Sequence, residues 1–532
     1  MECSSCSANP CKCISDSANP EIPSPLRPAS ARQVRQLLEH TKMIEEMNAA
    51  RETRNRKEMA ELRLLVKSSM GEGKQTATPS SHRERYQKLD VKRLQTLPLV
   101  FGEPPDWASL FAAHPPRLGS TESGVVQPFW SSIIRRLPRG KVILVDKHTT
   151  TSFGSRKPDV VGYLAGQPQS VAHIALIGEL KGRRSAGKDD FDDEEKGHLE
   201  SFLEELLLNY QPWRSSMFGF LSDGVLIQFF RLVVKPKKQL HEGPPMQLVE
   251  DGAWGLATLL ESPDYEGLKV EIRGAPVHVK DYLGSGGSAV VFSGELNGEE
   301  VVIKRFNENR PEALTREWMN LGAVKTLGSL VPRVLGTVGD VLILQPVGDK
   351  FASSVHSMDA LANLDDFVQL INILEQAHRK CGLVHRDVRL NNFFRIKGTT
   401  QVFLNDWGSA AAAGVLADFD GALQHAPDEI LDSWERGHQY KPAFSHDLEM
   451  VVRTVFHSTN TMTFREIQAE EDAKTLRTFW AHHLKPAVWQ RMLKAAQACE
   501  YAALKAIIAE LLPGQRCCEE EEQGEQRDRE GW

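Results

Sequence analysis

The chain has 532 residues, of which 41% are hydrophobic and 25% are charged, and its formal net charge is −7. This length and composition predict a soluble globular protein with two or three domains, each large enough to bury a core. The slightly acidic balance excludes a global basic field, so affinity for nucleic acid would require a local basic patch.

The N-terminal residues give no sign of export or membrane insertion. No apolar run is long enough to span a bilayer, and Met-Glu-Cys-Ser-Ser-Cys lacks the positive start and hydrophobic stretch of a signal peptide. We therefore expect a cytoplasmic or nuclear location and no membrane partner. Four of the eight cysteines lie near the start, too closely spaced for an ordinary zinc site, so an incidental cluster is the default interpretation: Cys3, Cys6, Cys11 and Cys13.

Residues 1–93 are expected to form a disordered leader, a charged helix and a linker. Residues 14–30 are rich in Ser, Pro and Asn, which cannot build a packed element. Residues 31–70 are helix formers with sparse apolar positions, as in a solvated helix. At the other end, the acidic run after Cys518 predicts a disordered tail over residues 513–532.

A first compact domain is expected over residues 94–249, followed by a linker over 250–278. Helix-like and strand-like patterns alternate here, which is typical of an α/β domain. The turn residues 165–169 predict that the strands on either side form a hairpin. The expected elements are helices over 125–137 and 194–209 and strands over 141–146, 160–164, 171–180, 217–221 and 225–234.

Two acids and a lysine should meet at one end of that hairpin. Asp159 begins the first strand and Glu179 ends the second, so antiparallel pairing brings the carboxylates together, and Lys181 shares a face with Glu179. Such a group can bind Mg2+ and orient a water for phosphodiester hydrolysis. This pattern resembles the PD-(D/E)XK nuclease superfamily, which also implies an additional acid, for which Glu122 is the candidate.

Basic residues near this site could contact phosphates and so make nucleic acid a partner. They are Arg183, Arg184, Lys188, Lys235, Lys237 and Lys238. An inactive domain of the same architecture is the alternative to an active nuclease.

A second domain is expected over residues 279–512, beginning with a glycine-rich turn between two strands. Gly284 and Gly286 let backbone N–H groups approach phosphate oxygens, with Ala289 in the third glycine position and Val291 after it. The lysine of Val-Val-Ile-Lys304 can then reach nucleotide phosphates. Its expected partner is Glu317 in the helix predicted over 313–324, with Glu312 as second choice.

The most specific stretch in the chain runs from Leu383 to Ser409. It contains His-Arg-Asp387, an asparagine five residues later at Asn392, and Asp406-Trp-Gly after an apolar strand. These residues can supply a base and two Mg2+ ligands. Together with the glycine-rich turn and Lys304, the stretch resembles the eukaryotic protein kinase fold.

That resemblance implies ATP and Mg2+ as cofactors and a protein as substrate. It implies that Asp387 is the base, that Asn392 and Asp406 bind the metal, and that Arg389 keeps positive charge beside the transferred group. Adenine is expected against the connection Gln345-Pro-Val347. Buried strand 341–344 leads into this connection, and the expected helices of the second lobe are 364–380, 445–456, 475–483 and 487–512.

Departures from the kinase pattern point to unusual control. Trp407 replaces the usual phenylalanine, Ala-Pro-Asp428 stands for Ala-Pro-Glu, and only Ser409 is available for phosphorylation between Gly408 and Pro427. We therefore expect constitutive or partner-controlled activity, with Asp418 or Asp420 pairing with Arg386 in place of a phosphate. A pseudokinase and a small-molecule kinase of the aminoglycoside or choline type are the alternatives.

Taken whole, the sequence predicts a multidomain α+β protein with three parts. These are a disordered leader with a helix, an α/β restriction-endonuclease-like domain and a bilobal kinase-like domain. The pairing resembles Crinkler-type effectors, although their ubiquitin-like header is missing. The predicted activity is serine/threonine kinase activity, with a nucleic-acid-directed protein whose kinase domain is regulatory as the alternative. The oligomeric state is left open.

Overall fold

The computed structural model describes residues 79–94, 108–112, 115–153, 156–183, 190–261, 263–265, 267–308, 310–351 and 362–512. All of these belong to one compact unit, Pro79–Trp532. The expected leader, the charged helix predicted over 31–70 and the acidic tail over 513–532 lie outside the described residues, as do the four N-terminal cysteines. Within the described ranges, no helix combines the length and apolarity needed to cross a membrane.

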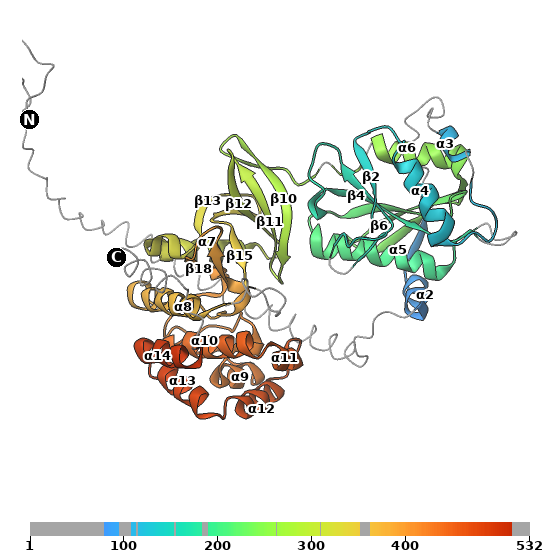
Figure 1. Ribbon diagram of the computed structural model, residues 1–532. Coiled ribbons are helices and arrows are strands. Elements are labelled where there is room, and N and C mark those ends of the chain that lie inside the picture. Colours follow the sequence, from blue (N-terminus) through green and yellow to red (C-terminus); the bar gives the residue numbers. More distant parts are fainter. Residues whose placement is uncertain are drawn as a thin grey trace, which may run out of the picture. The chain divides into compact units, whose positions relative to one another are not determined.

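An eight-stranded sheet organises the described residues before Glu261 (Figure 1). Its strands pair in the order β1-β7-β6-β5-β4-β3-β2, and β8 pairs with β6. Strands β2, β3 and β4 are antiparallel neighbours, whereas β4 and β5 run parallel. The bounds are β1 Val91–Arg93, β2 Val142–Asp146, β3 Val160–Leu164, β4 Ile174–Leu180, β5 Ser216–Ser222, β6 Leu226–Val233, β7 Gln239–Glu242 and β8 Met246–Gln247.

Helices cover both faces of this sheet, which explains why β3 and β4 are buried along their whole length. Side chains alternate by the period of two: Val161 and Ile177 pack with α5, while Val160 and Leu176 pack with α4 and α6. Figure 1 shows α5 on one side of the sheet and α4 and α6 on the other. The helices are α2 Pro79–Gln87, α3 Ser109–Ala112, α4 Gln127–Ile134, α5 Asp193–Glu205 and α6 Ala253–Glu261.

Two segments expected to be linkers are structured. Residues 79–93, the last part of the expected leader, helix and linker region, contain α2 and β1, and β1 extends the sheet by pairing with β7. The expected linker 250–278 contains α6, whose apolar side chains complete the core on one face, followed by β9 and the start of β10. Short or Gly- and Pro-flanked segments such as these show little periodicity in the sequence until a neighbouring strand or core completes them.

A six-stranded antiparallel sheet follows, in the order β13-β14-β12-β11-β10-β9. Helix α7 (Pro311–Val324) packs beside it and starts with Pro311 at its first position, where proline costs no hydrogen bond. The strands are β9 Val270–Ile272, β10 Ala275–Ser285, β11 Ala289–Leu296, β12 Glu299–Phe306, β13 Arg333–Val338 and β14 Val341–Gln345.

The remaining described residues form a largely helical lobe. Small sheets at its edge join β15-β17-β18 and β16-β19. The strands are β15 Gly348–Lys350, β16 Leu383–Val384, β17 Phe393–Ile396, β18 Val402–Leu404 and β19 Ala411–Ala412. The helices are α8 Leu364–Gln376, α9 Asp428–Glu435, α10 Phe444–Thr459, α11 Thr461–Phe464, α12 Ala473–His483, α13 Ala487–Gln497 and α14 Tyr501–Leu511.

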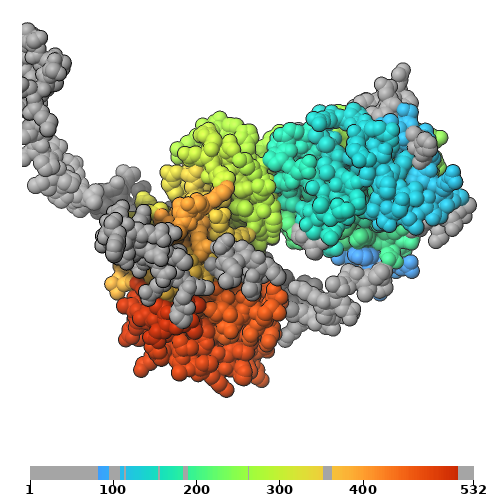
Figure 2. All heavy atoms as spheres, viewed as in Figure 1, coloured from blue at the N-terminus to red at the C-terminus, as the bar shows by residue number. Residues whose placement is uncertain are grey.

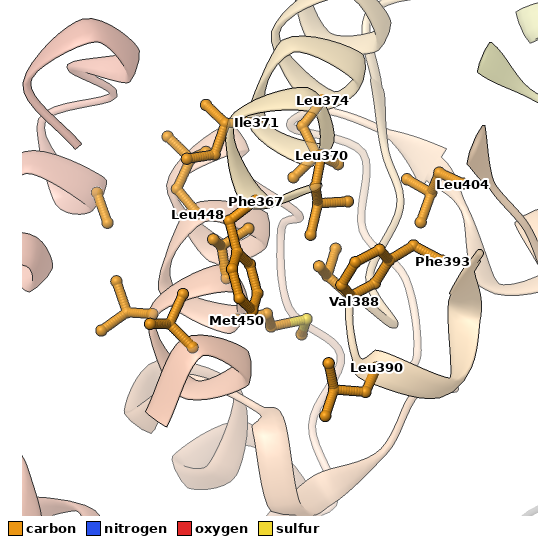
Figure 3. Packing of buried hydrophobic residues seen from close by; sticks show 14 of the residues in the cluster. Phe367, Leu370, Ile371, Leu374, Val388, Leu390, Phe393, Leu404, Leu448 and Met450 are labelled. Carbon is orange, nitrogen blue, oxygen red and sulfur yellow. The ribbon is translucent and has the colours of Figure 1, made fainter. Parts of the chain in front are cut away.

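The core of this lobe anchors the loop that follows β16. Val388 and Leu390 point into a cluster with Phe367 of α8 and Met450 of α10 (Figure 3). Because these two side chains are fully buried or nearly so, Asp387 and Arg389, which alternate with them, belong to a rigidly held loop.

Two expected elements are interrupted. The single helix predicted over 487–512 is two helices, α13 and α14, separated at Cys499, which has a positive φ of 54°. The strand predicted over 171–180 begins only at Ile174, since Val171–His173 form a 3-10 turn capped by Ser170. Neither break contains a glycine or proline, so the residue pattern did not predict it.

Candidate functional site

Lys304, Glu317 and Asp406 meet where the lobe of the six-stranded sheet faces the helical lobe; Lys304 and Glu317 are buried, and Asp406 is partly exposed. Lys304 lies in β12, and its Nζ is 2.5 Å from Glu317 Oε2 and 2.7 Å from Asp406 Oδ1. Glu317 lies in α7 and is the glutamate in contact with Lys304, as predicted; the second choice, Glu312, is not in this contact. Three residues that are 13 and 102 positions apart in the chain thus form one ionic group.

Burial and charge act in opposite directions on this group. Burial alone disfavours the ammonium, but Asp406 and Glu317 outweigh it and raise the pKa of Lys304 above its ordinary value. Burial raises the pKa of Glu317 to about 7, with Lys304 opposing and Asp406 adding to the rise. For Asp406, the attraction of Lys304 overcomes burial and lowers the pKa. The ammonium of Lys304 therefore stays protonated between the two carboxylates.

Asp387 is oriented by donors on both of its carboxylate oxygens. The amide nitrogen of Asn392 donates to Oδ2 at 2.6 Å, and the backbone N–H of Ala422 donates to Oδ1 at 2.8 Å. The guanidinium of Arg389 lies 3.1 Å from Oδ2. Because Asn392 uses its nitrogen on Asp387, its amide oxygen is the atom left to bind a cation.

Asp447 of α10 holds the loop that carries Asp387 in place through hydrogen bonds. Its carboxylate accepts the backbone N–H groups of His385 at 2.6 Å and Arg386 at 2.8 Å, and lies 2.9 Å from His378 Nε2. Burial opposes ionisation, but these hydrogen bonds and the nearby histidines lower the pKa of Asp447. Arg386 adopts a positive φ of 72°, so the hydrogen bonds hold a strained backbone.

A cleft of about 790 Å³ opens above these residues and is lined by the glycine-rich hairpin β10–β11. Of the predicted nucleotide-contacting residues, Gly284, Gly286, Ala289, Val291 and Lys304 line it, together with Asn392 and Asp406. Adding a Cβ at Gly286 would meet no atom within 4 Å, so the hairpin tip faces open space.

The two predicted adenine contacts are placed differently. Pro346 and Gly348 line the cleft, but Val347, which lies between them, is not among the described lining residues. The side chain of Gln345 turns away and donates to Glu299 at 3.0 Å, beside a separate pocket. A nucleotide base would meet the backbone of this connecting segment, whichever side chains it carries. Residue type is therefore a poor guide to which of these positions face the cleft.

Lys350 is a cleft residue that the sequence reasoning missed. It lies in β15, lines the cleft, and donates to the carbonyl of Leu283 in the hairpin. Partial burial lowers its pKa below the ordinary value. A lone lysine after the connecting segment has no motif around it, so only the pairing of β15 with β17 reveals its position.

The segment after Asp406 differs from one expectation. Arg386 does not pair with the carboxylate of Asp418 or Asp420: it donates to the backbone carbonyl of Asp418 and to the hydroxyl of Tyr440 at 2.8 Å. Asp420 instead lies 2.7 Å from Arg316 of α7.

The two residues that depart from the kinase pattern are both held in place. Trp407 is fully buried and donates from its indole N–H to Leu404 O at 2.9 Å. Asp428 pairs at 2.8 Å with Arg453 of α10.

The oxygen donors of this cleft suit a magnesium–nucleotide complex. Mg2+ in such sites takes one or two protein oxygens and completes its shell with phosphates and water, which matches Asn392 and Asp406. Consistent with so sparse a protein contribution, the described residues hold no group of three His, Cys, Asp or Glu arranged for a metal ion. The lysine beside them provides the positive charge for the phosphates. Taken together, the lobes and this cleft have a kinase-like arrangement.

The four residues predicted to form the nuclease-like site of the first domain also come together, and we call them the acid centre: Glu122, Asp159, Glu179 and Lys181. Asp159 accepts the backbone N–H of Leu180 at 2.8 Å, and its own N–H donates to Glu179 at 3.3 Å. Lys181 lies 3.0 Å from Glu179 and 3.7 Å from Glu122. Two further residues join them: Gln127 of α4 donates to Asp159 at 2.9 Å, and His198 of α5 lies 3.4 Å from Glu179. Neither carries a local motif.

The environment separates the two buried carboxylates electrostatically. Burial and the charge of Glu179 raise the pKa of Asp159 to about 7. Glu179 is more deeply buried, but His198 and Lys181 overcome the effect of burial and lower its pKa. Burial opposes the ammonium of Lys181, and its acidic neighbours outweigh it and raise the pKa. A divalent cation would relieve the repulsion between the two carboxylates.

The predicted phosphate-contacting patch does not take shape as expected. Among its described members, Arg183 pairs with Asp223, Lys235 with Glu308, Lys237 with Asp90, and Lys238 with Glu200 and Glu204. These carboxylates come from distant segments, so the ion pairs that neutralise the basic residues could not be predicted from local sequence. Arg184 and Lys188 lie outside the described residues.

Comparison with known proteins identifies partial likenesses. A family model described as "Domain of unknown function (DUF6826)" matches residues 125–214, within the first domain. Among solved structures, vaccinia related kinase 3 is 16% identical with a TM-score of 0.36, covering 47% of this chain and 92% of that one. The Cydia pomonella granulovirus kinase PK-1 is 16% identical with a TM-score of 0.33, covering 44% and 93%.

Proposed function

We propose that this protein is an ATP- and Mg2+-dependent kinase that transfers the γ-phosphoryl group to serine or threonine hydroxyls of a protein. The observation that carries the proposal is the buried contact of Lys304 with Glu317 and Asp406, beside a base-like Asp387. These residue types in this arrangement position phosphates and accept the proton of an attacking hydroxyl.

Each residue of the cleft has a role that follows from its contacts. Bound ATP supplies the phosphoryl group, and Mg2+ offsets the charge of its phosphates. Lys304 stays protonated between its two carboxylates and binds phosphate oxygens. Asp387 accepts the hydroxyl proton through a carboxylate held by Asn392 and Ala422. Arg389 keeps a positive charge beside Asp387 and orients it.

The test is transfer of labelled phosphate from ATP to generic protein substrates and to the protein itself. Asp387→Asn should lower the rate by about 10³-fold or more, because the residual rate lacks the proton acceptor. The matched control is Asp365→Asn, an exposed aspartate in the first turn of α8 that does not line the cleft. Equal activity of Asp387→Asn and wild type would refute the proposal.

Substrate class separates this proposal from its alternatives. Aminoglycosides and choline are assayed alongside protein substrates, and phosphorylation of the small molecules alone would indicate a small-molecule kinase. Absence of any transfer, with nucleotide binding absent as well, would indicate a pseudokinase.

A second activity is supported by the acid centre of the first domain. We propose that Asp159 and Glu179 hold Mg2+ and that Lys181 orients the attacking water in phosphodiester hydrolysis of nucleic acid. Support comes from the convergence of these residues, with Glu122, at one end of the β3–β4 hairpin. Their geometry places oxygen ligands and an ammonium within one small volume, which this chemistry requires.

This second activity is tested with labelled single- and double-stranded DNA and RNA in Mg2+ and in EDTA. Lys181→Met should abolish Mg2+-dependent cleavage while leaving kinase activity intact. Lys237→Met is the control, because that lysine is exposed and paired with Asp90 away from the acid centre. No cleavage by the wild-type protein under any of these conditions would leave the domain an architectural one.

A further inference from the structure

The end of β10 that leads into the glycine-rich turn is in contact with the first domain. The ring of Tyr282 in β10 lies 4.9 Å, between centroids, from the ring of Tyr210. The hydroxyl of Tyr282 is 2.8 Å from Ser285 Oγ, and Tyr282 also lines the cleft. One side chain therefore touches both the first domain and the loop expected to face nucleotide phosphates.

Tyr210 is itself firmly held by the first domain. It ends η4 (Leu206–Tyr210), the turn that continues α5, and is only 8% exposed. Its ring lies 5.6 Å from Phe153, which in turn lies 6.3 Å from Phe202 of α5. A packed aromatic row thus backs Tyr210, so its position follows that of the helix.

Trp213 braces the other strand of the hairpin. Its ring lies 5.9 Å from Phe292 in β11, which pairs with Tyr282 across the hairpin. The guanidinium of Arg305 lies over Trp213 at 4.9 Å. Apolar residues from both domains belong to one buried cluster. Figure 2 shows the outer surfaces of the first domain and of the six-stranded sheet lying side by side.

This bracing acts where the hairpin's own pairing is weakest. The β10–β11 register shifts between Val279 and Tyr282 and again between Tyr282 and Gly284. Bulges on both sides of Tyr282 interrupt the ladder of hydrogen bonds that would otherwise fix the strand. A Cβ added at Gly286 or Gly287 would meet no atom within 4 Å, so no side chain packs against the tip, which is held by the hydrogen bond from Asn307 to the Gly287 carbonyl and by the turn's own pairing. Packing at Tyr282 therefore contributes to the position of the loop.

We propose that Tyr210 is a positioning residue of the nucleotide cleft, through which the first domain holds the glycine-rich hairpin over the phosphate site. The inference rests on the proposed phosphoryl transfer. Tyr210 does not touch the cleft, so its loss leaves Asp387 and Lys304 in place and loosens only the loop. The effect therefore falls on nucleotide affinity and spares the chemical step.

The test uses the full-length protein and compares Tyr210→Ala with Tyr210→Phe. We expect Tyr210→Ala to raise KM for ATP about three- to tenfold, the range for loss of one aromatic pair, with kcat within about twofold. Tyr210→Phe should match wild type, because the ring contact is kept. Tyr163→Ala, which removes another buried tyrosine of the first domain, controls for general destabilisation.

A double-mutant cycle with Tyr282→Ala isolates the pair. If the two rings act on each other, Tyr210→Ala adds little to the KM increase caused by Tyr282→Ala. Additive effects, an unchanged KM in Tyr210→Ala, or an equal rise in Tyr163→Ala would each overturn the inference. Binding of a non-hydrolysable ATP analogue is measured in parallel, so that absence of phosphoryl transfer in the wild type counts against the proposed function instead.

Discussion

The guanidinium of Arg316 lies 2.7 Å from the carboxylate of Asp420, which ties α7 to the segment that follows Asp-Trp-Gly. Asn320, one turn further along α7, donates to the carbonyls of Trp407 and Ala410 at 2.8 and 3.0 Å. Glu317 lies between these two residues on the helix. Both contacts therefore favour the helix position in which Glu317 meets Lys304, without any phosphorylated side chain.

Loss of this tie should lower kinase activity modestly. Both side chains are about half exposed, so an ion pair of this kind contributes about 0.2–1 kcal/mol, and Asp420→Asn should reduce activity by about 1.4-fold to fivefold. Asp418→Asn is the matched control, since only the backbone carbonyl of Asp418 contacts Arg386. Steady-state kinetics that rank Asp418→Asn as the more damaging change would contradict the assignment.

Lys304→Met should both abolish phosphoryl transfer and destabilise the protein. It leaves the buried Glu317 without its cation, beside a partly exposed Asp406, and breaking such a buried pair typically costs about 3–5 kcal/mol. Adding Glu317→Gln removes one of the two facing charges, so the double variant should recover part of the lost thermal stability but none of the activity. A double variant less stable than Lys304→Met would show that the carboxylates do not repel each other there.

Asp159 should make stability depend on pH between about 4 and 7. Its pKa is raised from 3.8 to about 7 in the folded protein, so its contribution to stability is full below pH 3.8 and is lost as pH rises through 7. The expected loss is about 2–4 kcal/mol. Urea unfolding of Asp159→Asn should lack this loss, whereas Asp251→Asn, an exposed control, should retain the wild-type profile. Parallel profiles for all three proteins would refute the raised pKa.

Trp407→Phe should destabilise the helical lobe by about 1–3 kcal/mol. The change removes the indole N–H that donates to Leu404 O and leaves space beside His385, whose ring lies 4.8 Å away. Because Asp406 precedes this residue, activity should fall as well. Differential scanning calorimetry and kinase assays check the two effects, and a variant as stable as wild type would mean that phenylalanine fits the site equally well.

Many local elements could be predicted from the pattern of residues alone. The strand 160–164 has the predicted bounds, and strands 141–146 and 217–221 agree to within one residue at each end. Periodicity failed where it was short or absent, as in β1, and at the break between α13 and α14. The resemblance to Crinkler-type effectors, the location in the cell and the partners remain predictions.

The predicted site residues converge to different degrees. Lys304, Asn392 and Asp406 line the cleft, and Asp387 and Glu317 line a second pocket that shares Asp406 with it. In the first domain, Asp159, Glu179, Lys181 and Glu122 share one centre. Gln127, His198, Lys350 and Tyr210 were missed, because each acts through a contact with a distant segment. The ion pairs that neutralise the predicted basic patch were missed for the same reason.

The sequence by itself determined which chemical groups each motif supplies, such as the base, the amide and the carboxylate between Leu383 and Ser409. This was possible because the order and spacing of those residues can be read along a loop or strand that the local pattern also predicts. Only the tertiary structure decided which carboxylate meets Lys304, which arginine meets Asp420, and what supports the glycine-rich hairpin. Those choices depend on side chains up to about a hundred positions apart, brought together by burial of the two sheets and the helical core.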